Sequence, residues 1–357
     1  MTGLVLPNSY PKDIPMRFPT TRTRTHTHTL RLALVAGFAF CTPAFAVLTM
    51  DYVSVGHAGN AADPATGSLY GAVAYAYQIG KYEVTNTQYG EFLNAVDPGG
   101  TNANGVYNAS MGSDARGGIT YTALAASGAK YTISTSMGDK PVNYVSWYDG
   151  ARFTNWMHNG QGNGSTETGA YTLSGNTGII LKNVGATVYL PSEDEWYKAA
   201  YYDPTAGAGG GDNYWEYATQ SNTAPTVGTA NATGVISNPG ANVANYNLGA
   251  QWNSQNGNVT TVGSAAAGNY FGTADQAGNV KEWNDAVIAP YRGQRGGSWI
   301  DDSSGLAASL RNFSAPENEF SVVGFRVASV PVPEPSAFLV SVLLVSAVLT
   351  RRRRSTR

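Results

Sequence analysis

Helical spacing is clearest between residues 85 and 100. Apolar side chains recur at positions i, i+3, i+4 and i+7 over residues 89–96, which is the spacing of one buried helical face. Thr85 and Gln88 precede them as a capping box, in which two side chains satisfy free N–H groups at a helix start. The sequence DPGG at 97–100 then ends the pattern. This spacing predicts a helix from about residue 85 to residue 96.

Two more segments carry the same signals. Ser146 precedes apolar residues that share a helical face between 153 and 157. Ser192 and Glu195 form a second capping box, and three acidic residues fall in the turn after Ser192, where the helix dipole stabilises negative charge. We therefore predict helices that begin after Ser146 and after Ser192.

Strand patterns are short and the connections are long. Residues 72–81 alternate as a strand does, and residues 294–299 and 324–328 are also typical of strands. Stretches rich in Gly, Ser, Thr or Asn and without helical spacing separate these elements: 100–139, 159–186 with a possible hairpin, and 203–272. The pattern predicts an α+β fold with one loop-rich domain at 72–330, little regular secondary structure, and a polar lead-in at 47–71.

The N-terminal 46 residues have the organisation of a secretory signal peptide. Basic residues spread from Arg17 to Arg31 precede an apolar run at 32–40, and Ala44-Phe45-Ala46 is a small-x-small cleavage site before Val47. The other interpretation is a short buried segment. We expect residues 1–46 to be removed and the protein to be exported through the inner membrane.

Charge changes the picture once both ends are set aside. The whole chain has a net charge of −2, but residues 1–46 hold five basic residues and one acid, and residues 335–357 hold five arginines. The body retains 12 basic and 23 acidic residues, a net charge of −11. Because phosphate binding needs clustered Lys and Arg, this acidic body argues against a nucleic-acid partner.

The C-terminal residues 331–357 combine three features in order. Pro333, Glu334 and Pro335 precede an apolar run at 337–349, which is followed by four arginines. This tail resembles a PEP-CTERM sorting signal. The resemblance implies processing by an exosortase-type enzyme, a transient membrane anchor through 336–350, and delivery to the outer envelope or exterior of a Gram-negative bacterium. A plain tail anchor is the alternative, with the same topology.

The body contains no cysteine, because Cys41 lies in the leader. It therefore has no disulfide, no thiolate nucleophile and no thiolate metal ligand.

Five motifs occur in one order along the body. They are IGKYEVTN at 79–86, PVNYVSW at 141–147, LPSEDEW at 190–196, AGNVKEW at 277–283, and RGGSW at 295–299 with GFR at 324–326. Together they resemble the formylglycine-generating enzyme family, also called the sulfatase-modifying-factor domain. The resemblance implies a variant of the C-type-lectin fold with little regular secondary structure.

The founding enzyme of that family oxidises a substrate cysteine with oxygen and copper, using two active-site thiols. By resemblance those thiols fall near Ser303 and Ala308, and neither side chain can bind copper as a thiolate does. We therefore expect no copper and none of the founding chemistry. A second branch of the family is iron-dependent and uses a histidine-rich partner domain, whereas this body has only His57 and His158.

Calcium is the metal that the remaining residues suit, because it prefers hard oxygen ligands. By resemblance, a first site comprises Asp275, the carbonyls of Gly278 and Val280, and Glu282. A looser second site comprises Asn245, the carbonyl of Tyr246, Asn256 and the carbonyl of Asn258. The alternative is that Glu282 pairs with a buried arginine and that Asn279 caps a turn.

Two groups of side chains have two interpretations each. Arg295, Arg311 and Arg326 are either a binding trio or core braces that pair with acids such as Glu195 or Glu282. The aromatic residues Trp215, Tyr217, Tyr246, Trp252 and Tyr270 form either a stacking surface for sugar or peptide, or packing under long loops.

Two functions follow. The first is a non-catalytic module, structural or binding an extracellular polysaccharide or protein, and stabilised by calcium. The second is a metal-dependent oxidase or another enzyme of the family that uses a site without cysteine.

Overall fold

The computed structural model describes residues 47–173, 179–205 and 211–331. All of the described residues belong to one compact unit. The predicted leader, the sorting motif Pro333–Pro335 and the apolar run at 337–349 lie outside the described residues. Within the described ranges, no helix combines the length and the apolar character that a membrane crossing requires.

The three capped helices are confirmed. Helix α1 spans Asn86–Val96, α3 spans Trp147–His158 and α4 spans Glu193–Tyr201. All three begin with a complete capping box, with Thr85, Ser146 and Ser192 as the caps. These local signals hold because the cap and its partner are three residues apart and need no distant contact. A further short helix, α2 (Ser110–Ser113), lies within the stretch expected to be a loop.

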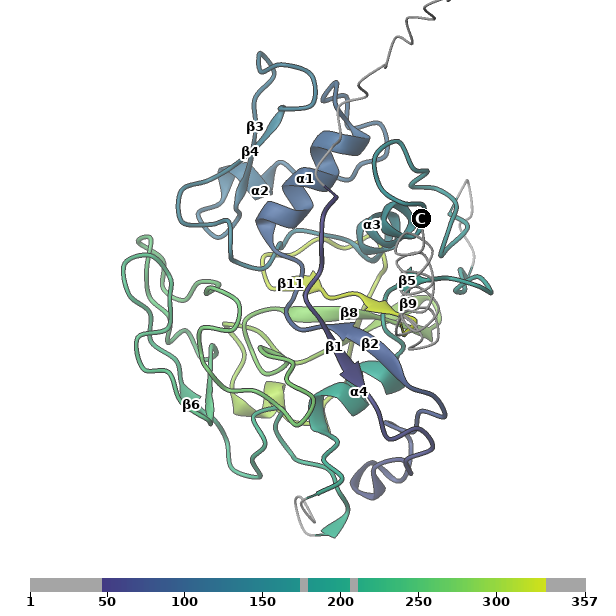
Figure 1. Ribbon diagram of the computed structural model, residues 1–357. Helices are drawn as coiled ribbons and strands as arrows, with labels where there is room; N and C mark the ends of the chain where they lie inside the picture. The colour runs from purple at the N-terminus through teal and green to yellow at the C-terminus, as the bar shows by residue number, and fades with distance from the viewer. Residues whose placement is uncertain (1–46, 174–178, 206–210, 332–357) are drawn as a thin grey trace, which may run out of the picture. The chain divides into compact units, whose positions relative to one another are not determined.

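Two four-stranded sheets organise the domain (Figure 1). The first has the order β1-β2-β12-β5 and contains β1 (Tyr52–Val55), β2 (Tyr77–Gly80), β12 (Ala328–Ser329) and β5 (Val188–Tyr189). The second has the order β10-β9-β8-β11 and contains β10 (Asn312–Ser314), β9 (Tyr291–Arg295), β8 (Lys281–Ile288) and β11 (Val323–Phe325). All pairs are antiparallel except β8–β11.

The remaining elements are small. Strands β3 (Ile119–Tyr121) and β4 (Tyr131–Ile133) form a hairpin beside α1, and β6 (Thr226–Val227) pairs in parallel with β7 (Val243–Ala244). Two 3₁₀ turns, Pro64–Thr66 and Ser303–Leu306, complete the described elements. The α+β, loop-rich fold class is confirmed.

Several strand boundaries differ from the prediction. Only 77–80 of the predicted strand 72–81 is a strand, and 296–299 forms a turn after β9. The predicted strand 324–328 is split between β11 and β12, and the lead-in contributes β1. Strand β8 is the longest of the described strands, and the sequence pattern did not predict it. Its sequence, KEWNDAVI, begins with polar residues, and the side chains that pair with them lie far along the chain.

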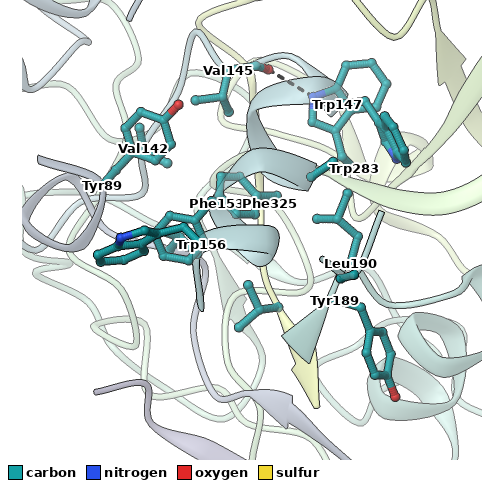
Figure 2. Close-up of a cluster of buried hydrophobic side chains, with 14 of the residues drawn as sticks. Tyr89, Val142, Val145, Trp147, Phe153, Trp156, Tyr189, Leu190, Trp283 and Phe325 are labelled. Carbon is teal, nitrogen blue, oxygen red and sulfur yellow. Dashed lines mark hydrogen bonds between the residues drawn. The ribbon is translucent and has the colours of Figure 1, made fainter. Parts of the chain in front are cut away.

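The main core lies where α1 and α3 meet β11 and β8. Phe92, Phe153 and Trp156 pack edge to face, with ring centroids 5.4 Å apart for Phe92–Phe153 and for Phe92–Trp156, and Phe153 lies 5.5 Å from Phe325 of β11. Figure 2 shows this cluster continuing to Trp283 of β8. Such edge-to-face pairs add to the stabilisation that comes from burying apolar surface.

Candidate functional site

The turn that follows β9, residues 296–301, is linked by side-chain contacts to the first residue of β8. Gly296 and Gly297 adopt left-handed φ angles of +98° and +70°. The Ser298 hydroxyl donates to the Asp301 carboxylate at 2.5 Å, and Lys281 Nζ lies 2.6 Å from the same carboxylate. The loop is therefore fixed by a chain of polar contacts from Ser298 through Asp301 to Lys281.

The two positions at which the family resemblance places thiols lie directly after this loop. Ser303 begins the 3₁₀ turn that Asp302 caps. Ala308 is buried; its N–H donates to the Glu216 carbonyl at 2.8 Å, and its own carbonyl accepts from Arg295 at 3.0 Å. The two positions therefore carry the hydroxyl group of Ser303 and the buried methyl group of Ala308 in place of thiols.

The arginine braces are confirmed, although one partner differs from the prediction. Arg295 and Arg311 both donate to Glu193 in the first turn of α4, at 2.9 and 2.8 Å from their Nε atoms. Glu195, the expected partner, instead accepts the Ser192 N–H in the capping box and a hydroxyl from Tyr189. Glu193 lies two residues before Glu195 in the same turn, so its side chain leaves the helix in a different direction, and this carboxylate pairs with both cations.

Glu282 and Arg326 form a fully buried ion pair at the centre of the domain. Both side chains have zero exposure, and the Arg326 guanidinium donates to the two Glu282 oxygens at 2.5 and 2.6 Å. Trp196 donates a further hydrogen bond to Glu282 at 2.6 Å. The remaining Arg326 N–H groups reach backbone carbonyls, including that of Ala274 at 2.9 Å. This is the alternative pairing that the sequence allowed for Glu282.

Glu83 is a second buried acid at this centre, and no sequence argument assigned it a role. One carboxyl oxygen accepts from the Asn279 amide at 3.1 Å, and the other is buried without a hydrogen-bond partner among the described residues. Burial, together with the nearby charges of Asp275 and Glu282, raises the pKa of Glu83 well above its usual range. Burial likewise raises the pKa of Asp275 to about 6. The only feature of the sequence that could have pointed to Glu83 is its place between Tyr82 and Val84, where an acidic residue interrupts a largely apolar segment.

We expect Glu83→Gln to remove part of the pH dependence of stability. The folded chain keeps a proton on Glu83 that the unfolded chain releases above about pH 4.3. This group's stability contribution is therefore fully present below that pH and is lost as pH rises, at about 1.4 kcal/mol per pH unit, until the folded carboxyl also ionises. Urea unfolding at pH 5 and pH 7 measures it: the variant gains stability relative to wild type between the two. Parallel pH profiles for both proteins would refute the assignment.

The structure brings together residues from both predicted calcium sites. The Asn245 amide donates to the Asn258 carbonyl at 2.9 Å and to the Asn279 side chain at 3.1 Å, and the Asn279 N–H donates to the Asn245 carbonyl at 2.8 Å. Gly278 touches the same segment so closely that an added Cβ would lie 2.2 Å from the Asn245 carbonyl oxygen. Asparagine side chains and carbonyls therefore surround Asn245.

The other predicted ligands make contacts of their own. The Tyr246 carbonyl, which is the predicted ligand atom, accepts the Gly249 N–H at 3.1 Å, and the side chains of Tyr246 and Val280 are buried in two different core clusters. Asn256 is exposed, and Asp275 accepts a hydrogen bond from the Gly263 N–H. Across the described ranges, no three His, Cys, Asp or Glu side chains are grouped as a metal site.

Among the predicted ligand atoms, the Asn245 side-chain oxygen is the one that the structure leaves buried without a donor in the described part of the chain. A buried amide oxygen without a partner costs free energy unless a cation or a donor reaches it. The calcium prediction therefore depends most on Asn245.

The predicted aromatic surface is mostly interior. Tyr217, Tyr246 and Trp252 are buried, so for them packing under the long loops is the correct interpretation. Tyr270 remains 37% exposed, and Trp215 is half-buried with its indole N–H on Asp203 at 3.2 Å.

The two histidines of the body occupy separate places. His57 is exposed beside the rings of Tyr202 and Tyr270, with centroids 6.2 and 5.9 Å away. His158 lies at the end of α3, and its Nδ1 accepts the Thr187 N–H at 3.1 Å.

Comparisons with known proteins support the family resemblance. The family model described as the sulfatase-modifying factor enzyme 1-like domain matches residues 56–330. Among curated proteins, the chain is similar to hercynine oxygenase of Mycobacterium tuberculosis (strain ATCC 25618 / H37Rv), with 24% identity over 278 residues. That match covers 71% of this chain and 52% of the relative, so the chain spans about half the length of the curated relative it matches.

Solved structures give more distant similarities. The crystal structure of CarF has a TM-score of 0.46 and 21% identity, covering 80% of this chain and 99% of the other. Treponema denticola variable protein 1 has a TM-score of 0.46 and 18% identity, with coverages of 81% and 100%. PvdO from Pseudomonas aeruginosa has a TM-score of 0.38 and 18% identity, with coverages of 72% and 82%.

Proposed function

Because the chain belongs to the family of sulfatase-modifying factor enzyme 1-like domains, we propose that it uses this fold as a non-catalytic binding or structural module. The observation that carries the proposal is the segment after β9. The body has no cysteine, and the positions near Ser303 and Ala308 carry no thiol. Copper chemistry of the founding type needs soft sulfur ligands, which these residues cannot supply. The variant of the C-type-lectin fold, which presents loops on a stable base, is part of this proposal.

Export is the second part of the proposal. The signal-peptide pattern at 1–46 and the sorting pattern at 331–357 support delivery to the outer envelope or the exterior, with processing by an exosortase-type enzyme. Edman sequencing of the protein purified from its envelope tests the first cleavage. We expect the mature chain to begin at Val47, and an intact leader would refute it.

Calcium is the third part. We place the ion at Asn245, with the Asn258 carbonyl, the Tyr246 carbonyl and Asn256 as the rest of the predicted second set, because the Asn245 oxygen has no hydrogen-bond partner among the described residues and calcium prefers oxygen ligands of this kind. Asp275, Gly278, Val280 and Glu282 remain a predicted first set, in which Glu282 shares its oxygens with Arg326. Such an ion would tie the 245–258 loops together and take no part in a reaction.

Calcium should raise the melting temperature of the full chain. At a calcium concentration about a hundredfold above Kd, binding stabilises the folded state by about 2.7 kcal/mol, which corresponds to about 5–10 °C for a domain of this size. Calorimetry with calcium, with magnesium and with a chelator measures the shift. Asn245→Ala should abolish the difference between calcium and chelator. Equal melting temperatures for the wild type in all three conditions would remove calcium from the account.

An enzyme of the same family is the second candidate, and the observation that favours it is the similarity to hercynine oxygenase. A metal-dependent oxidase would use donors other than cysteine. It predicts iron or copper retained after purification, so metal analysis of the protein separates the two candidates.

A further inference from the structure

A cleft of about 560 Å³ opens between the turn that joins β8 to β9 and the loop at 315–317. This volume lies within the range of small-ligand sites, about 300–1,000 Å³. Its lining includes two tyrosines, two prolines, one arginine and one glutamate: Tyr148, Tyr291, Pro290, Pro316, Arg292 and Glu317. The cleft is separate from the loop after β9, and no motif in the sequence pointed to it.

The walls of the cleft are held in place by buried contacts. The backbone N–H of Trp147, at the start of α3, donates to the Pro316 carbonyl at 2.9 Å, and this bond fixes the wall formed by the 315–317 loop. The Arg292 guanidinium stacks 3.7 Å above the Trp147 ring and donates to the Asp285 carbonyl and carboxylate at 3.2 and 3.3 Å. A preformed site avoids the entropy cost of ordering loops when a ligand binds.

The arginine of the cleft is already paired with a carboxylate outside the lining, whereas the glutamate of the cleft has no ion-pair partner among the described residues. Arg292 is the cation among the described lining residues, and it is 5% exposed and paired with Asp285. Its guanidinium also donates to the Ile180 carbonyl, so few of its donors remain for a ligand. Glu317, in contrast, is exposed and has acceptor oxygens available. These charges disfavour an anionic ligand and favour a neutral one that offers hydroxyl donors.

Aromatic surface continues beyond the cleft. Tyr291 is 39% exposed, and its ring packs 5.2 Å from the ring of Phe313, which is 54% exposed. Tyrosine combines an apolar ring face with a polar hydroxyl. A sugar ring has the matching character, because its C–H faces are apolar and its edges carry hydroxyl groups.

We propose that this cleft is a binding site for a neutral carbohydrate, with Tyr291 as the stacking platform and Glu317 as a hydroxyl acceptor. The inference rests on the proposed function and deepens it by naming a ligand class and a place. It assigns binding to the β8–β9 turn and the 315–317 loop, and gives the aromatic residues of the 215–270 region no part in it.

A glycan array with neutral and acidic members tests the inference on the full chain, in a detergent without a sugar headgroup. Three variants accompany the wild type: Tyr291→Ala, Glu317→Gln and the matched control Tyr270→Ala, whose tyrosine is 37% exposed and lies outside the cleft. Neutral glycans should bind to the wild type and to Tyr270→Ala. Titration of the best neutral glycan should show about tenfold weaker binding for Tyr291→Ala and a clear loss for Glu317→Gln. Melting curves that match wild type confirm that these surface variants fold.

Three results would overturn the inference: binding of acidic glycans alone, binding lost in Tyr270→Ala but kept in Tyr291→Ala, or no glycan bound at all. None of them bears on whether the protein catalyses a reaction, which is measured separately by product formation. A failed carbohydrate site and a failed non-catalytic function are therefore distinguishable.

Discussion

Replacing Arg326 with methionine should destabilise the domain by about 3–5 kcal/mol. The change leaves the Glu282 carboxylate at zero exposure with Trp196 as its remaining side-chain donor. It also removes the guanidinium N–H that donates to the Ala274 carbonyl. Loss of one member of a buried pair costs more than loss of an exposed pair, because the remaining charge has no solvent to stabilise it. Urea unfolding followed by circular dichroism measures the change.

Two comparisons make this experiment specific. Glu167→Gln removes an ion pair with Arg152 in which both side chains are partly exposed, and it should cost about 1 kcal/mol or less. The double variant Glu282→Gln/Arg326→Met removes the stranded charge and should recover part of the loss. If the double variant were as unstable as the single one, the buried charge would not be the cause.

Replacing Trp283 with alanine should cost about 3–5 kcal/mol. The indole has zero exposure in the centre of the core, and its N–H donates to the Val145 carbonyl at 3.0 Å (Figure 2). The change therefore creates a cavity and leaves a buried carbonyl without its partner. The half-buried Trp215→Ala is the control, and we expect a clearly smaller loss. Equal losses in the two variants would mean that β8 is not a central element of the core.

The predictable part of the fold is its local part. The three helix starts follow from cap residues three positions apart, and the apolar spacing behind each cap names the buried face. Strand β8 is the opposite case. The sequence predicts no strand for it, because the partners of its charged residues, Asp301 for Lys281 and Arg326 for Glu282, lie 20 or more positions away. Tertiary pairing converts polar positions into buried ones, and no short window of sequence contains that information.

The candidate sites, like strand β8, could be predicted only as far as local sequence determines them. Motif order identified the family and the absence of thiols, because both are properties of the sequence itself. The aromatic residues Tyr246 and Trp252 were possible surface platforms in sequence, but long loops fold over them. The exposed aromatic residues Tyr291 and Phe313 belong instead to neighbouring strands of one sheet. Their proximity depends on strand pairing, so composition alone could not locate the cleft.

The most direct test of the account measures aldehyde formation on a cysteine-containing sulfatase peptide. The full chain and its form lacking residues 1–46 are incubated with the peptide, oxygen and added copper, and an active formylglycine-generating enzyme serves as the positive control. Mass spectrometry then reports conversion of the peptide cysteine. We expect unchanged peptide beside complete turnover in the control, whereas formylglycine produced by this chain would show that the domain remains a catalyst without thiols.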